Sequence, residues 1–194
     1  LSENSNFAKI ITDHGFKFIG PKYEHIHKMA NKIEAKSIAN KVGLPILPGS
    51  SDNVLDYLEA KSIAESIGYP IIIKSTNGGG GRGIKVVLKE KELKNSFLLA
   101  KKEAELSFGS NQVYIEKYLS NPRHIEIQVL CDNQGNAVHL GERECSIQRR
   151  NQKIIEECPS PAISDNERKR ICEITIKAMK KIGYFNIGTV EYLY

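Results

Sequence analysis

Five glycines lie within six consecutive positions of the chain, at residues 78–81 and 83. Two apolar stretches border them, residues 69–74 and 84–88, and each has the composition of a β-strand. A glycine loop between two strands resembles the phosphate flap of kinases, where backbone N–H groups close over a triphosphate. The loop opens into a strand and carries no Gly-Lys-Ser/Thr, so it fits neither a dinucleotide fingerprint nor a P-loop. We predict a phosphate-binding loop, with a mobile hairpin tip as the alternative.

The rest of the chain has the apolar spacing of a mixed α and β protein. Residues 44–50 hold two prolines and are predicted to be an extended linker with a pivot at Gly49 and Ser50. The unit that follows the linker has the size of a small lid. The predicted helices are 6–14, 22–42, 56–67, 90–108 and 164–182, and the predicted strands are 16–19, 69–74, 84–88, 113–118, 124–130, 137–140 and 189–193.

Two polar patterns follow the predicted lid. His124, Glu126 and Gln128 alternate with apolar residues and therefore share one face of a strand, a pattern that a half-solvated strand also produces. Residues 142–153 are densely polar and contain both charge signs, where a short loop is expected. Such segments are often functional, because arginine and lysine fix planar anions while carboxylates hold metals or orient the bases.

Two single residues carry a chemical signal. Lys74 ends an apolar strand directly before the glycine loop, where its ammonium can reach phosphate oxygens; a strand-end lysine in solvent is the alternative. Glu191 is flanked by apolar residues, and a carboxylate on a mostly buried strand is costly unless it is paired or bound to a cation. Lys32, on a helix rich in charges, is interpreted as a surface residue. The residues alone therefore indicate a nucleotide-phosphate enzyme that uses magnesium.

Charge and cysteine usage narrow the remaining classes. The net charge is +5, but Lys and Arg are scattered, so we expect no nucleic-acid partner. No apolar run reaches about 20 residues, so no membrane span is expected. The four cysteines lack metal-knuckle spacing, which indicates reduced thiols in a cytoplasmic or mitochondrial-matrix compartment. A first residue Leu1 and a strand that ends at Tyr194 suggest a fragment of a longer protein.

Read in order, these segments resemble the biotin carboxylase family over nearly the whole chain. The stretch 121–157 is the most specific, since another ATP-grasp ligase such as carbamoyl phosphate synthetase is not expected to combine residues 123–128 with 148–153. Residues 142–146 and 149–153 look most like propionyl-CoA carboxylase α subunits, whereas acetyl-CoA and pyruvate carboxylases usually carry histidine where Asn151 stands. The matching segments are 1–4, 18–21, 31–34, 67–74, 78–83, 116–119, 121–128, 142–153 and 188–191.

The resemblance implies an ATP-grasp fold of the α+β or α/β class, truncated at both ends. It divides the chain into the end of an N-terminal domain with a connecting helix (1–46), a lid domain (47–118) and the start of a C-terminal ATP-grasp domain (119–194).

The resemblance also assigns roles to individual residues. It moves Lys32 from the surface to the ATP phosphates, together with Lys74, and makes Glu191 a ligand of Mg²⁺ or Mn²⁺. The catalytic residues that it implies are Lys153, Gln148 and Glu126, with Cys145 close by but without obligatory chemistry. The nucleotide-binding residues that it implies are Gly78, Gly79, Gly80, Gly81, Gly83, Glu116, the backbone of Lys117, Leu119, His124 and, more weakly, Asn151.

The implied reaction has two steps. Bicarbonate attacks the γ-phosphate of ATP to give carboxyphosphate, which then carboxylates N1′ of biotin. The implied partners are bicarbonate, a biotin carboxyl carrier domain and a carboxyltransferase subunit, in a protein that is oligomeric when complete. The family's base, its bicarbonate-binding arginine and its second magnesium glutamate fall beyond residue 194, so residues 1–194 alone are expected to bind nucleotide weakly or not at all and not to turn over. The alternatives are the biotin carboxylase of an acetyl-CoA or pyruvate carboxylase, another ATP-grasp ligase, and a catalytically incomplete nucleotide-binding module.

Overall fold

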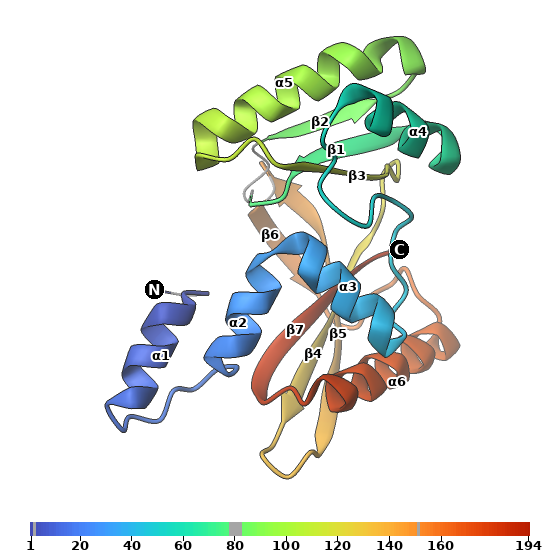
Figure 1. Cartoon of the computed structure of the whole chain (residues 1–194). Helices are drawn as coiled ribbons and strands as arrows, with labels where there is room; N and C mark the ends of the chain where they lie inside the picture. Colours follow the sequence, from blue (N-terminus) through green and yellow to red (C-terminus); the bar gives the residue numbers. More distant parts are fainter. Residues whose placement is uncertain (2, 78–82, 151) are drawn as a thin grey trace. The chain divides into compact units, whose positions relative to one another are not determined.

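The structure is a computed structural model that describes residues 1, 3–77, 83–150 and 152–194, and it divides into two compact units (Figure 1). Unit 1 contains Leu1–Ala30, Ile38–Pro45 and Pro122–Tyr194, and unit 2 contains Asn31–Ser37 and Ile46–Asn121. The helices are α1 (Ser5–Asp13), α2 (Tyr23–Ala30), α3 (Lys32–Val42), α4 (Tyr57–Ile67), α5 (Glu90–Phe108) and α6 (Asp165–Ile182). The strands are β1 (Ile71–Ser75), β2 (Ile84–Val87), β3 (Val113–Lys117), β4 (His124–Cys131), β5 (Ala137–Arg149), β6 (Gln152–Glu157) and β7 (Asn186–Leu193).

Unit 2 is a three-stranded antiparallel sheet in the order β2-β1-β3, with α4 and α5 packed on it (Figure 1). Its core includes Ile71, Ile73, Leu93 and Ile115, none of which has exposed surface. Helix α4 begins as the sequence predicts, because Asp56 accepts a hydrogen bond from the Glu59 N–H. The central strand β1 leads directly into the glycine loop, so the sheet holds the root of that loop.

Unit 1 is a four-stranded antiparallel sheet in the order β6-β5-β4-β7, and α6 packs on β4 and β5. The alternation of residues 124–130 is confirmed, since Ile125, Ile127 and Val129 are fully buried in the core of this unit. Helix α6 starts with the predicted capping box, in which Ser164 and Glu167 exchange side-chain and backbone hydrogen bonds. The sheet therefore has an apolar face toward α6 and a polar face that carries charged side chains.

Three predicted elements are wrong. Residues 16–19 form no strand: Phe16 and Ile19 are exposed, and the described part of the chain pairs no strand with them. The predicted helix 22–42 is two helices, because the Asn31 side chain accepts from the N–H groups of Ile33 and Glu34 and starts α3 afresh. The predicted polar loop 142–153 lies mostly in strands, in the second half of β5 and the start of β6.

The predicted pivot is packed against β3. Ser50 donates its N–H to the Ile115 carbonyl, and its hydroxyl accepts from the Ile115 N–H over 3.0 Å. A Cβ atom on Gly49 would lie 2.3 Å from the Ile115 carbonyl oxygen, so only glycine fits at this position. The glycine is therefore used for close approach of two backbones, and these hydrogen bonds contradict a pivot at residues 49 and 50.

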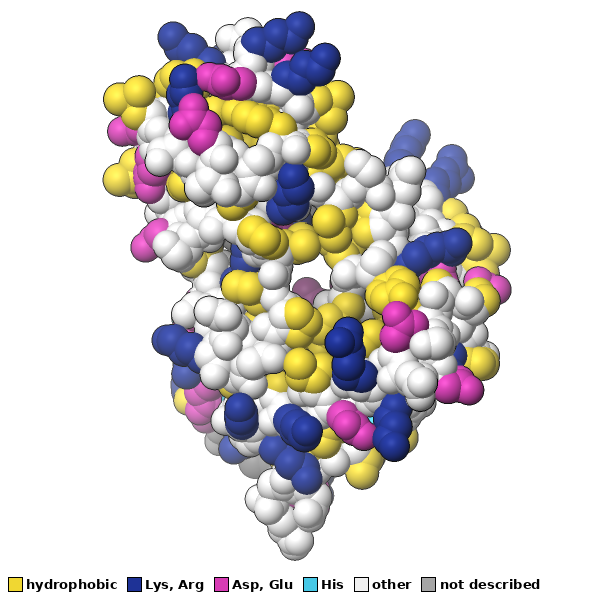
Figure 2. All heavy atoms as spheres, turned by 90° about the vertical axis from the view of Figure 1, so that its right-hand side faces the viewer, with side chains coloured by type: hydrophobic (Ala, Val, Ile, Leu, Met, Phe, Trp, Pro, Cys, Tyr) yellow, Lys and Arg dark blue, Asp and Glu magenta, His cyan; other side chains and the backbone are white. Residues whose placement is uncertain are grey.

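The surface carries both charge signs. On the face shown in Figure 2, Lys and Arg side chains lie in separate groups with Asp and Glu between them. Among the described residues, no helix combines the length and the apolar character that a membrane crossing requires.

Candidate functional site

The first cluster of candidate residues lies in unit 2 and consists of Lys36, Lys74 and Glu116, here called the Glu116 cluster. Lys74 Nζ donates to Glu116 Oε2 over 2.7 Å, and Lys36 Nζ lies 2.8 Å from Oε1. Lys74 and Glu116 come from neighbouring strands β1 and β3, and Lys36 from the second turn of α3. Each oxygen of one carboxylate is thus held by a different lysine.

The carboxylate of the Glu116 cluster is buried, with 7% of its side chain exposed. Burial raises the pKa of Glu116, but the charges of Lys74 and Lys36 and their hydrogen bonds outweigh it and lower the pKa below its ordinary value. Burial and the Glu116 charge raise the pKa of the neighbouring Tyr114, so its phenol stays neutral. The cluster therefore holds a buried, ionised carboxylate between two lysine side chains.

The other residues of unit 2 that were predicted to bind the nucleotide lie close to members of this cluster along the chain. Lys32 is the first residue of α3, one turn before Lys36, and is half-buried. Lys117 donates its N–H to the Pro48 carbonyl and its Nζ to the carbonyls of Gly68 and Tyr69, which fixes the turn before β1. Leu119, two residues after the end of β3, is half-buried.

The glycine loop is described only at its ends. Gly78, Gly79, Gly80 and Gly81 lie outside the described residues. Gly83 has a φ of +66°, and a Cβ atom there would lie 3.1 Å from Cβ of Ser75. Ser75 donates its N–H to the Gly83 carbonyl over 3.0 Å, so these two residues form a hydrogen-bonded pair at the base of the loop. The backbone at Gly83 thus requires glycine for a structural reason.

The second cluster lies on the polar face of the unit 1 sheet and contains Glu126, Arg143, Lys153 and Glu191, here called the Glu126 cluster. Its arrangement follows from strand register, because Glu126 on β4 lies directly opposite Arg143 on β5 and Glu191 on β7. Arg143 Nε donates to Glu126 Oε1 over 2.7 Å. Lys153 Nζ, from β6, donates to Glu126 Oε2 and, over 2.5 Å, to Glu191 Oε1.

Burial differs sharply within the Glu126 cluster. Only 4% of the Glu126 side chain is exposed, and burial raises its pKa, but Lys153 and Arg143 together lower the pKa below the ordinary value. Lys153 loses hydration on burial, yet the two carboxylates raise its pKa, so it remains a cation. Glu191 is 61% exposed, which contradicts the prediction of a mostly buried carboxylate; β7 alternates exposed and half-buried positions. Lys153 pairs with Glu191, which is the alternative to a metal ligand that the sequence left open.

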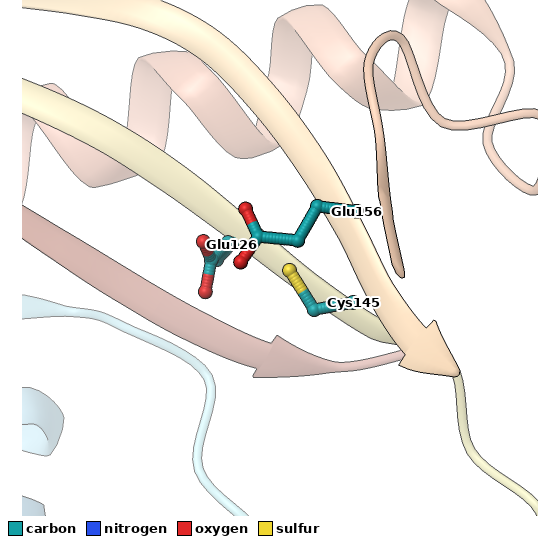
Figure 3. A group of neighbouring side chains, drawn as sticks. All are labelled: Glu126, Cys145 and Glu156. Atoms are coloured by element: carbon teal, nitrogen blue, oxygen red, sulfur yellow. The ribbon is translucent and has the colours of Figure 1, made fainter. Parts of the chain in front are cut away.

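Cys145 and Glu156 lie beside Glu126, on β5 and β6 (Figure 3). One ligand atom of each of these three residues lies within 4.8 Å of the others, a spacing that a metal ion could use. Arg143 and Lys153, however, already neutralise Glu126, and Arg143 also lies 3.1 Å from Glu156. Burial and the neighbouring Glu126 raise the pKa of Cys145 to about 11, so its thiol is protonated at neutral pH. These charges favour a salt-bridged group over a metal site.

The remaining predicted residues of unit 1 take separate positions. His124 begins β4 and donates its N–H to the Ser146 hydroxyl. Gln128 accepts from Arg143 over 3.0 Å and donates to the Gly188 carbonyl, so it supports the Glu126 cluster. Gln148 lies opposite Lys153, but its side chain donates to the Cys145 carbonyl at an irregular point of β5. Asn151 lies outside the described residues.

Lys36 and Arg143 are the two members of these clusters that the sequence did not predict. A signal for Lys36 was present, because it lies one helical turn after Lys32 and thus on the same face of α3. Arg143 lies in the polar segment 142–153, and strand pairing in the structure places it opposite Glu126. Reading that segment as a loop concealed this register.

Comparisons with known proteins identify the family and the fold of the chain. Residues 31–194 match the family described as the carbamoyl-phosphate synthase L chain, ATP binding domain. The whole chain is 49% identical to pyruvate carboxylase of Staphylococcus aureus and spans 17% of that protein. It is 48% identical to a biotin carboxylase of Campylobacter jejuni, solved as a complex with βγ-ATP, with a TM-score of 0.93 over 100% of this chain and 43% of the other.

A third relative is a biotin carboxylase domain that was solved with bound nucleotide and bicarbonate. It belongs to 2-oxoglutarate carboxylase of Hydrogenobacter thermophilus, in complex with MgADP, ADP and bicarbonate. It is 44% identical, with a TM-score of 0.91 over 98% of this chain and 42% of the other. The chain thus spans less than half of each of these relatives. It belongs to the family of carbamoyl-phosphate synthase L chain ATP-binding domains and has the ATP-grasp fold of biotin carboxylases.

Proposed function

We propose that this chain is the ATP-binding part of a biotin carboxylase, which uses ATP to activate bicarbonate and then carboxylates biotin on a carrier domain. The observation that carries the proposal is the Glu126 cluster. Three of its four residues, Glu126, Arg143 and Lys153, come from the segment 121–157, which most specifically resembles the family. Lys153 lies there as a cation against two carboxylates, those of Glu126 and Glu191. Such a lysine can pass from carboxylate oxygens to the oxygens of bicarbonate and carboxyphosphate without becoming unpaired.

The proposed roles fall on residues of both units. In unit 2, Lys74, Lys32 and the glycine loop bind the phosphates of ATP, while Glu116, Lys117 and Leu119 frame the base. In unit 1, an oxygen of bicarbonate, held near Lys153, attacks the γ-phosphorus, and the bond from that phosphorus to ADP breaks. Carboxyphosphate then yields carbon dioxide and phosphate, and N1′ of biotin attacks the carbon dioxide after passing its proton to the base that the family carries beyond residue 194. Exclusion of water by the lid protects carboxyphosphate from hydrolysis.

Glu191 fits the role of one magnesium ligand. Its carboxylate is exposed, and magnesium prefers one or two carboxylates together with phosphate oxygens and retained water. Magnesium would shield the negative charge of the phosphates during transfer. Lys153 donates a hydrogen bond to Oε1 of Glu191 and so competes with a metal ion for that oxygen. When the ion binds, Lys153 would keep Glu126 as its partner.

The finer proposal is that the complete protein carboxylates propionyl-CoA. It is supported by residues 142–146 and 149–153, which look most like propionyl-CoA carboxylase α subunits. Pyruvate carboxylase is the second candidate, because the whole of this chain aligns with part of the S. aureus enzyme. Carboxylation assays with the partner carboxyltransferase and propionyl-CoA, acetyl-CoA or pyruvate distinguish them. Incorporation of label from bicarbonate into pyruvate, and into neither propionyl-CoA nor acetyl-CoA, would exclude the acyl-CoA assignment.

The reaction itself is tested by ATP hydrolysis in the intact protein. We expect hydrolysis to need bicarbonate, to rise with free biotin and to disappear in Lys153→Ala. Lys169→Ala, which removes an exposed lysine of α6, is the matched control and should retain activity. Hydrolysis that ignores bicarbonate and biotin would leave only a general ATP-grasp activity and would overturn the proposal.

A further inference from the structure

Glu116 has one more lysine than neutralisation of its charge requires. A buried carboxylate needs a partner, and either Lys36 or Lys74 alone would supply one positive charge. The side chains of Lys36 and Lys74 are only 20% and 24% exposed, so both are held in place rather than extended into solvent. Lys36 Nζ also lies 5.9 Å from the centre of the Tyr114 ring, which faces it from β3. Lys36 therefore has a fixed place on the far oxygen of the carboxylate.

The two lysines differ in what else they can reach. Lys74 lies at the root of the glycine loop, opposite Ile84, the first residue after Gly83. Phosphate oxygens bound by that loop would come close to Lys74 and draw its ammonium away from Glu116. Lys36 lies on α3, on a different element from the loop. A ligand that engages Lys74 would therefore leave Lys36 as the counter-ion of Glu116.

We propose that Lys36 is a positioning residue for nucleotide binding, which keeps Glu116 ionised and in place when Lys74 turns to the phosphates. The inference rests on the proposed function, because it assumes that the loop and Lys74 bind a nucleotide. Lys36 acts through Glu116 and has no contact with the nucleotide in this scheme. Among the described residues, the titratable groups that face Glu116 are Lys36 from α3, Lys74 from β1 and Tyr114 from β3, and the phenol of Tyr114 stays neutral.

Loss of Lys36 has a consequence that a purely structural lysine would not produce. In Lys36→Met, nucleotide binding would remove the remaining partner of a buried carboxylate, which would then take up a proton, since burial favours the neutral form. Binding would become coupled to that proton, and affinity would rise as the pH falls, by up to about tenfold per pH unit. In the wild type, Lys36 keeps the charge paired, so Glu116 adds no proton uptake.

The experiment is calorimetric titration of the intact protein with ADP and Mg²⁺, in buffers of different ionisation enthalpy between pH 6.5 and 8.5. We expect Lys36→Met to take up as much as one proton more than the wild type and to bind ADP at least about tenfold more weakly at pH 8. Lys36→Arg should restore wild-type behaviour. Glu116→Gln added to Lys36→Met should abolish the extra proton uptake. Lys41→Met, an exposed lysine of the same helix, is the control for lost charge.

The outcomes separate the inference from the function beneath it. Weaker binding by Lys36→Met without extra proton uptake would show a merely structural role and overturn the inference. Unchanged affinity and unchanged proton uptake would overturn it as well. A wild-type protein that binds no ADP would overturn the proposed function and the inference together.

Discussion

Replacement of Arg143 by methionine tests how the Glu126 cluster is held together. Arg143 donates to Glu126 over 2.7 Å and to Gln128 over 3.0 Å, and only 28% of its side chain is exposed. Water cannot readily replace the lost donor, because Glu126 itself is 4% exposed. A hydrogen bond to a charged group contributes roughly 1.5–3 kcal/mol. Lys153 still neutralises Glu126, so the roughly 3–5 kcal/mol cost of an unpaired buried charge is not reached.

We therefore expect Arg143→Met to lower the free energy of unfolding by about 2 kcal/mol. The assay is urea unfolding followed by far-UV circular dichroism, with the slope against urea held common to all variants. Arg149→Met, at the exposed end of the same strand, is the matched control and should change stability by less than about 0.5 kcal/mol.

A double-mutant cycle with Glu126→Gln isolates the pair. If the ion pair is the source of the effect, Arg143→Met should cost about 1 kcal/mol less in the Glu126→Gln background than in the wild type. Equal costs in both backgrounds would refute the reasoning, because the loss would then come from packing of the arginine stem. A cost no larger than that of Arg149→Met would refute it too.

Three further predictions concern charge, backbone and thiols. Because the folded-state pKa of Glu126 is lowered, its contribution to stability is present above the ordinary value of 4.5 and is lost as the pH falls through the lowered pKa. The difference in unfolding free energy between wild type and Glu126→Gln, measured by urea unfolding, should therefore shrink below about pH 4.5. A difference that grows there would contradict the pairing. Gly49→Ala should lower the thermal unfolding midpoint, since its Cβ would lie 2.3 Å from the Ile115 carbonyl oxygen. An unchanged midpoint would show that β3 shifts without cost to accommodate the methyl group. Cys158, which is exposed, should react with a thiol reagent at pH 8 well before Cys145, which is buried and has a pKa of about 11; equal rates would disprove the burial of Cys145.

The elements that the sequence predicts well are those with local causes. Helix α6 follows from a capping box at Ser164 and Glu167 and a terminating Gly183, all within reach of its own residues. Helix α4 has a similar cap in Asp56 and ends at Gly68, whereas α5 ends at Gly109 but starts without a side-chain cap. Residues 16–19 have strand composition but no paired strand in the described chain, and a strand requires a partner for its backbone hydrogen bonds. Composition alone therefore overpredicted that element.

The polar segment 142–153 misled for the opposite reason. Its charges suggested a solvated loop, yet on paired strands they can neutralise one another across one face of the sheet. Register places Arg143 opposite Glu126, and Lys153 reaches the same carboxylate from β6. A sequence pattern shows which residues share a face, but it does not show which neighbouring strand supplies the opposite charge. The pairing of Lys36 with Glu116 was hidden in the same way, because 80 positions separate them in the chain.

The Glu116 and Glu126 clusters share one electrostatic arrangement. In each, a buried carboxylate holds a lysine that we propose for an anionic ligand, Lys74 in one and Lys153 in the other. Each carboxylate also has a second cation, Lys36 or Arg143. Such a lysine is positioned in advance and exchanges one anion for another, so ligand binding need not strip water from a free ammonium group. The second cation completes the exchange, because the carboxylate left behind remains paired.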